Sequence, residues 1–171
     1  FKIYIIFFCI GAILFVALVL QQKGINLTTV TNAGFLTGLY VVIVPGLALI
    51  IFRKQPHWSV WPSSCGCICG LFLLNGGTLS EIASGDLWVI LSSFFWALHV
   101  ILVGVIAASS GRPLTLACVQ FSAGALLSMV CTLIYETPSI DVILTFWPEI
   151  LFAGAISVGI AFTLQVVGQR Y

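Results

Sequence analysis

Long apolar runs separated by short polar connections dominate the chain. Six of these runs have roughly the 20 residues that an α-helix needs to cross the hydrocarbon core of a bilayer. They contain no Lys, Arg or Asp, and their one Glu is Glu149, at the start of the sixth run. Backbone amides in lipid must be satisfied within each helix, so the pattern predicts an all-α bundle of about six transmembrane helices. The predicted spans are Ile3–Leu20, Thr31–Phe52, Trp58–Leu74, Leu87–Ala108, Leu114–Tyr135 and Pro148–Val167.

Composition supports the same class of protein. Hydrophobic residues make up 61% of the chain and charged residues 6%, against roughly 25% charged in an ordinary soluble domain. No basic patch indicates nucleic-acid binding. The six cysteines lie in apolar runs, and the alternating Cys65, Cys67 and Cys69 have no His or carboxylate near them in sequence, so we predict small-residue packing and no metal site.

The charged residues predict an orientation. With the amino end in the cytoplasm, Lys2, Arg53, Lys54, Arg112 and Arg170 fall on the inner side. Lys23 then falls outside, together with the five acidic residues Glu81, Asp86, Glu136, Asp141 and Glu149. This is the excess of cytoplasmic Lys and Arg that short membrane loops show.

Prolines and glycines mark special positions within the spans. Pro113 and Pro148 stand where a first helical turn begins, a position that proline tolerates. Pro45 falls deep in the second span and predicts a kink there. The pairs Gly34-xxx-Gly38 and Gly66-xxx-Gly70 predict close helix crossing, although small residues are also tolerated in contact with lipid.

The first and sixth spans share a pattern. The first contains Gly11-Ala12-Ile13 and ends Leu20-Gln21-Gln22-Lys23-Gly24. The sixth contains Gly154-Ala155-Ile156 and ends Leu164-Gln165-Val166-Val167-Gly168, with one residue more between the two motifs. If this is true repetition, the repeat unit is five helices long and its second copy is inverted in the membrane, as in many secondary transporters.

The chain resembles the EamA-type transporters of the drug/metabolite transporter superfamily. Three stretches carry the resemblance: residues 20–25 running into 31–40 and Pro45, residues 85–88 followed by Phe95-Trp96-Ala97-Leu98-His99, and residues 153–171. The resemblance implies ten helices in two inverted five-helix repeats. Residues 1–80 would then supply the last three helices of the first repeat, and residues 81–171 the first three of the second.

Two features depart from that family. The loop Arg53-Lys54-Gln55-Pro56 lacks the acidic residue that often follows the fourth helix. Helices one, two, nine and ten have no counterpart here, so we expect this chain to be part of a longer protein.

Polar groups within spans are the candidates for solute contact, because they are costly against lipid. Trp96 and His99 are three positions apart and share a helix face, which the resemblance places near a central cavity. The alternative is that Trp96 packs between helices and His99 bonds a carbonyl. The other candidates are Asn32, Tyr40, Gln120 and Gln165, of which the two glutamines could instead link helices. Pro45, Gly34 and Gly38 are candidates for a kink or gate.

The leading functional hypothesis is a secondary carrier, expected to be an exporter, of small metabolites such as amino acids or drug-like compounds. No nucleotide-binding loop, catalytic residue or cofactor motif is found, so no enzyme activity and no cofactor are predicted. The alternatives are a non-transporting membrane scaffold or receptor and, less favoured, an intramembrane enzyme. The expected location is a bacterial inner (plasma) membrane. The expected partners are lipid and a small solute; a coupling ion and a homodimer are left open.

Overall fold

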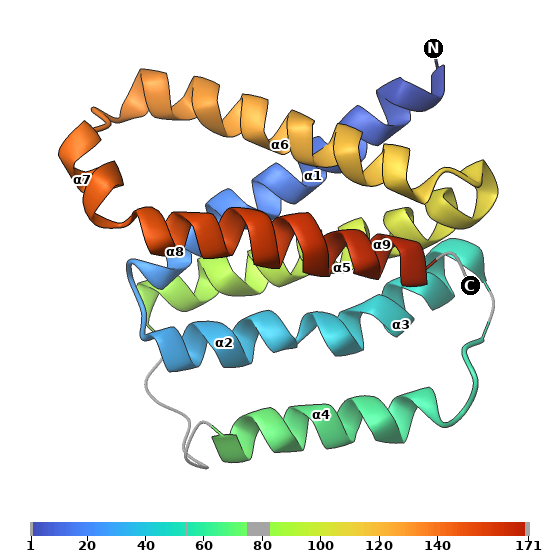
Figure 1. Ribbon diagram of the computed structural model, residues 1–171. Coiled ribbons are helices and arrows are strands. Elements are labelled where there is room, and N and C mark those ends of the chain that lie inside the picture. The colour runs from blue at the N-terminus through green and yellow to red at the C-terminus, as the bar shows by residue number, and fades with distance from the viewer. Residues whose placement is uncertain (1, 54, 75–82, 170–171) are drawn as a thin grey trace. The chain divides into compact units, whose positions relative to one another are not determined.

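The computed structural model describes residues 2–53, 55–74 and 83–169, and the elements within these ranges are helices (Figure 1). In chain order they are α1 (Lys2–Ile25), α2 (Val30–Gly38), α3 (Tyr40–Phe52), α4 (Val60–Leu74), α5 (Ser84–Ser110), α6 (Pro113–Tyr135), α7 (Ile140–Thr145), α8 (Trp147–Leu151), η1 (Phe152–Phe162) and α9 (Thr163–Gly168). The all-α prediction is therefore confirmed over the described ranges.

Five segments are long and apolar enough to cross a membrane: Lys2–Ile25, Val30–Phe52, Ser84–Ser110, Pro113–Tyr135 and Trp147–Gly168. They match five of the six predicted spans. The remaining predicted span, Trp58–Leu74, forms α4, which has 15 residues within the described ranges and is shorter than the other five. The predicted count of six is therefore not reached among the residues that the structure describes.

Local chemistry accounts for several helix ends. The Thr29 hydroxyl accepts a hydrogen bond from the backbone N–H of Asn32 at 3.1 Å and so caps the start of α2. Pro113 and Pro148 both lie in the first turn of their helices, as predicted. Gly111, with φ of +65°, allows the turn between α5 and α6, and Arg53, with φ of 53°, follows the last residue of α3 in a left-handed conformation.

The second predicted span is interrupted at Leu39, between α2 and α3, whereas the kink predicted at Pro45 stays a prediction. The N–H of Leu39 donates to the Leu36 carbonyl at 3.2 Å, a tighter pairing than that of an α-helix. Pro45 is buried inside α3, where it cannot donate a backbone hydrogen bond. The break therefore precedes the proline, at the point where Gly38 and Leu39 separate α2 from α3.

The chain divides into two compact units, and α1 and α5 contribute to both. The first unit consists of Phe1–Phe15 and Leu102–Tyr171, and the second of Val16–Ile101. These units reflect packing, and their boundaries differ from the division near residue 80 that the sequence repeat predicts.

The first unit has a core made by four helices. In it the chain reverses direction at α7, so that the segment from α8 to α9 lies alongside α6 (Figure 1). The buried apolar residues of this core come from α1, α5, α6 and α9: Phe7, Ile10, Val103, Ala107, Leu116, Ala117 and Val166. Within the last span, Phe152–Phe162 forms a π-helix, which the apolar pattern of the sequence did not indicate.

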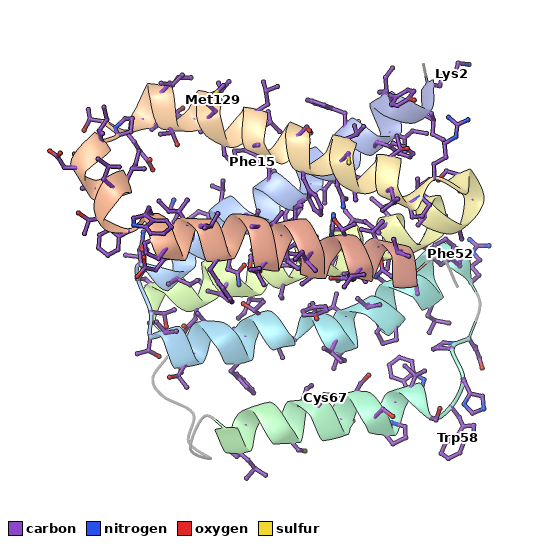
Figure 2. All side chains as sticks on the ribbon, viewed as in Figure 1. Lys2, Phe15, Phe52, Trp58, Cys67 and Met129 are labelled. Carbon is purple, nitrogen blue, oxygen red and sulfur yellow. The ribbon has the colours of Figure 1, made fainter. Side chains whose placement is uncertain are left out.

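In the second unit, α2 and α3 lie beside α4 (Figure 1). Much apolar surface stays uncovered in both units, including Ile50 of α3 with 73% of its surface exposed and Leu133 of α6 with 69%. Figure 2 shows the side chains that project from the helices, among them Trp58 before α4 and Met129 on α6, which are 73% and 59% exposed. Apolar surface of this extent suits contact with lipid.

Candidate functional site

Helix α5 carries a row of polar residues through an otherwise apolar span. Asp86, Ser92, Ser93 and His99 are all buried, with at most 6% of their surfaces exposed, and Trp96 is half-buried. From Asp86 to His99 the row extends for about 20 Å at the usual helical rise of 1.5 Å per residue. Such groups are costly to bury unless they are hydrogen-bonded. We call these five residues the α5 polar row.

The two serines are satisfied by their own helix. The Ser92 hydroxyl donates to the Val89 carbonyl at 2.8 Å, and the Ser93 hydroxyl donates to the Ile90 carbonyl at 2.7 Å. This is the usual arrangement of hydroxyls in an apolar helix, because a carbonyl one turn back is always within reach.

Gln21 connects the middle of the row to two other helices. The Trp96 indole N–H donates to Oε1 of Gln21 at 3.1 Å, and Nε2 of Gln21 donates to the Thr37 hydroxyl at 3.0 Å. One amide therefore joins α1, α5 and α2 within the second unit. Gln21 belongs to the motif at the end of the first predicted span, but it was not predicted as a site residue.

Trp96 and His99, which were predicted to share a helix face, form a ring pair. Their ring centroids are 6.0 Å apart and the ring planes are nearly perpendicular, at 89°. An edge-to-face arrangement of this kind is favourable between aromatic rings. The two best candidates for solute contact therefore form one aromatic pair, and Gln21 holds one end of it.

The start of α5 is fixed tightly against the end of α1. A Cβ on Gly85 would lie 2.5 Å from the Gly24 carbonyl oxygen and 2.6 Å from the Leu27 carbonyl carbon. A Cβ on Gly24 would lie 2.5 Å from a Val89 methyl group and 2.9 Å from the Gly85 carbonyl oxygen. Only glycine permits so close an approach of the two backbones.

Charged groups surround this contact. Asp86 accepts hydrogen bonds from the Thr28 hydroxyl at 2.5 Å and from the Ala83 backbone N–H at 2.9 Å. The ammonium group of Lys23 lies 3.8 Å from the centre of the Trp88 ring, within the range of a cation–π interaction. The α5 polar row thus begins at a rigid, charged helix junction.

The six predicted binding residues do not all fall in one unit. Trp96, His99, Asn32 and Tyr40 belong to the second unit, where Asn32 lies in the first turn of α2 and Tyr40 begins α3. Both of these are half-buried. Gln120 and Gln165 belong to the first unit, and they differ: Gln120 is completely buried, and Gln165 is exposed.

The close contacts predicted at two glycine pairs are not seen among the described residues for three of the four glycines. A Cβ on Gly34, Gly66 or Gly70 would meet nothing within 4 Å in the described chain. Close contacts occur instead at Gly24 and Gly85 and, in the first unit, at Gly11, where a Cβ would meet the Gln120 carbonyl oxygen and lie 2.8 Å from the Ala123 methyl group. None of these three belongs to a GxxxG pair, so that motif could not have indicated them.

Cys65, Cys67 and Cys69 of α4 are exposed thiols, and Figure 2 shows Cys67 on that helix. Within residues 2–53, 55–74 and 83–169, no three His, Cys, Asp or Glu side chains come together in a way that could hold a metal ion.

The fold and the α5 polar row define a class of protein: an integral membrane protein whose apolar helices enclose a few polar side chains. The sequence model of the EamA-like transporter family matches residues 83–171, which include α5, α6 and the last span. The chain belongs to this family.

One relative extends the comparison. A protein of Archaeoglobus fulgidus named as an uncharacterized transporter is 26% identical over 96 residues. The aligned part is 56% of this chain and 30% of the relative, so the chain spans about a third of the relative's length. No solved structure matches the chain significantly.

Proposed function

We propose that the protein is a secondary carrier that exports small metabolites, such as amino acids or drug-like compounds. The observation that carries the proposal is the α5 polar row. It places buried hydroxyl, carboxyl, indole and imidazole groups along one apolar 27-residue helix of a chain that belongs to a transporter family. Polar groups are retained at this depth in a membrane protein where they serve a solute path.

In this proposal Trp96 and His99 contact the solute. Their mutual contact supports a joint role, and the bond from Trp96 to Gln21 ties the pair to α1. Asn32 and Tyr40 would contribute from α2 and α3. Gln165 would contribute from the last span, and its exposure supports this role. The complete burial of Gln120 instead supports a role in joining helices.

The break between α2 and α3 is the proposed gate. Helix α2 ends at Gly38, Leu39 forms a turn, and Pro45 leaves the Val41 carbonyl without its usual helical donor. Gly34 has open space around it, which would allow the segment to move without a clash. Interrupted helices of this kind are common near the solute sites of secondary transporters.

We also propose that residues 1–80 and 81–171 belong to two inverted repeats of a longer carrier. The matching ends of α1 and α9, and a family match that starts at residue 83, support this division. The amino end and the loops with Arg53 and Arg112 would face the cytoplasm of a bacterial inner membrane, as the distribution of basic residues favours.

Transport by the full-length protein in proteoliposomes tests the proposal. The probes are radiolabelled proteinogenic amino acids and the fluorescent cation ethidium. We expect Trp96→Ala and His99→Ala each to lower transport efficiency by about tenfold, equivalent to roughly 1.4 kcal/mol of lost contact. The matched controls are Trp147→Ala, whose side chain is 57% exposed on α8, and His57→Ala, which lies in a loop and contacts Ser59.

Both control variants should keep wild-type transport. Wild-type rates and affinities for Trp96→Ala and His99→Ala would contradict the proposed site. The absence of flux for every probe would contradict the proposed solute class.

A further inference from the structure

We propose that Gln21 is a positioning residue that fixes the Trp96 indole, so that a solute meets the face of the ring and not its N–H group. This inference rests on the proposed function, because it specifies how Trp96 takes part in binding. It goes beyond the sequence prediction, which named Trp96 and left Gln21 outside the site.

The first argument is the use of the single donor on the indole. A tryptophan side chain has one N–H group and no acceptor. In this protein that N–H donates to Oε1 of Gln21 at 3.1 Å. A solute in contact with Trp96 is therefore left with the carbon surface of the ring, which offers apolar and π contact.

The second argument is that Gln21 is itself held in place. Its Nε2 donates to the Thr37 hydroxyl at 3.0 Å, so both ends of the amide are engaged at once. Rotation of the amide would break both bonds. Two helices, α1 and α2, thus combine to set the direction from which the Trp96 N–H is bound.

The third argument is a second restraint on the indole. The His99 ring lies perpendicular to it, at 89°, with centroids 6.0 Å apart. Gln21 and His99 together restrict rotation of the indole. Removal of Gln21 should release one of these restraints while leaving the ring itself in place.

A measurement without solute tests the positioning directly. The full-length protein keeps Trp96 and has its other described tryptophans, Trp58, Trp61, Trp88 and Trp147, replaced by phenylalanine, with any tryptophan elsewhere in the full-length protein replaced in the same way. Time-resolved fluorescence anisotropy then reports the motion of the Trp96 ring on the nanosecond scale. We expect Gln21→Met, which has similar length and no amide, to increase the amplitude of this motion at least twofold.

Thr37→Val is the matched control in the same chain of bonds. It removes the partner of Nε2 and leaves the bond from Trp96 to Oε1, so we expect a smaller increase than for Gln21→Met. Unchanged anisotropy in Gln21→Met would overturn the inference, and so would an equal increase in Thr37→Val.

A double-mutant cycle on transport tests the consequence for binding. The probe is the amino acid, or ethidium, that gives the highest flux in the proteoliposome assay. We expect Gln21→Met and Trp96→Phe each to raise KM about fivefold with little change in maximal rate, and the double variant to be no worse than either alone. Each single variant removes the same hydrogen bond, so the two effects should not multiply.

The outcomes separate this inference from the proposed function. If Trp96→Ala impairs transport but the effects of Gln21→Met and Trp96→Phe on KM multiply, the inference fails and the proposed site stands. If Gln21→Met lowers the thermal stability and leaves KM unchanged, Gln21 is only structural and the inference fails. If Trp96→Ala transports normally, the proposed site fails, and the inference fails with it.

Discussion

The end of α1 and the end of the last span have similar sequences and different surroundings. Gln21 is half-buried and bonded to two other helices, whereas Gln165, at the matching position, is exposed. Gly24 lies against the backbone of α5, whereas a Cβ on Gly168 would meet nothing within 4 Å. The residues that the two motifs share therefore mark positions where a close contact can form. Whether it forms depends on the neighbouring helix.

The same difference appears at the other end of the motif. Gly11 faces the Gln120 carbonyl, and Gly154, in the π-helix, has open space. An exposed glutamine in a membrane span needs a polar partner or water. If the proposed inverted repeat is correct, the face of the last span that carries Gln165 corresponds to the face of α1 on which Gln21 bonds Trp96 and Thr37.

The largest difference in the stability effect of matched substitutions is expected at Gly11 and Gly154. A methyl group at Gly11 would overlap the Gln120 carbonyl oxygen, a backbone atom that cannot move aside, so Gly11→Ala should destabilise the protein by about 1–3 kcal/mol. Gly154→Ala should change stability by less than about 0.5 kcal/mol. Thermal unfolding of the purified full-length protein in detergent measures both, and equal effects would remove the contrast between the two segments.

A smaller difference is expected at Gly24 and Gly168. The atom nearest to a Cβ on Gly24 is a Val89 methyl group, which can shift, and the nearest backbone atom is the Gly85 carbonyl oxygen at 2.9 Å, which is farther away than the Gln120 carbonyl oxygen is from a Cβ on Gly11. Gly24→Ala should therefore cost about 1 kcal/mol, at the low end of the range for overpacking. Gly168→Ala is the control and should be neutral in the same unfolding assay. A neutral result for Gly24→Ala, with no gain in stability when Val89→Ala is added, would show that the helices do not approach so closely.

The smallest difference is expected at the two glutamines. Gln21→Leu leaves the Trp96 N–H and the Thr37 hydroxyl without their present partner, so we expect a loss of about 1 kcal/mol in stability. Gln165→Leu replaces an exposed side chain and should stay within about 0.5 kcal/mol of wild type. A larger loss for Gln165→Leu would show that this glutamine is the one engaged in the full-length protein.

The sequence was sufficient to locate five membrane spans and insufficient to predict the contacts between their helices. Span length and apolar character located the helices, and Pro113 and Pro148 located two of their starts, because these depend on the local chain alone. Which glycine meets a neighbouring helix depends on packing. Residues that face lipid and residues that face protein are equally apolar, so Gly24 and Gly34 look alike in the sequence.

The candidate site, too, was only partly predictable from the sequence. The spacing of Trp96 and His99 predicted that the two residues share a helix face, and their rings do lie close together. Gln21 could not be assigned to them, because it is 75 residues away from Trp96 and its partner helix was unknown. The π-helix at Phe152–Phe162 was missed because its residues are as apolar as those of an α-helical span.

The most direct test of the central claim, that Trp96 lies at the solute site, uses the full-length variant that keeps Trp96 as its only tryptophan. Its fluorescence is recorded during titration with each transported probe that lacks indole and does not absorb at the emission wavelength. The account predicts a saturable change in Trp96 emission whose midpoint follows KM, and loss of this change with probes that are not transported. Saturable transport with no change in Trp96 emission would contradict the account.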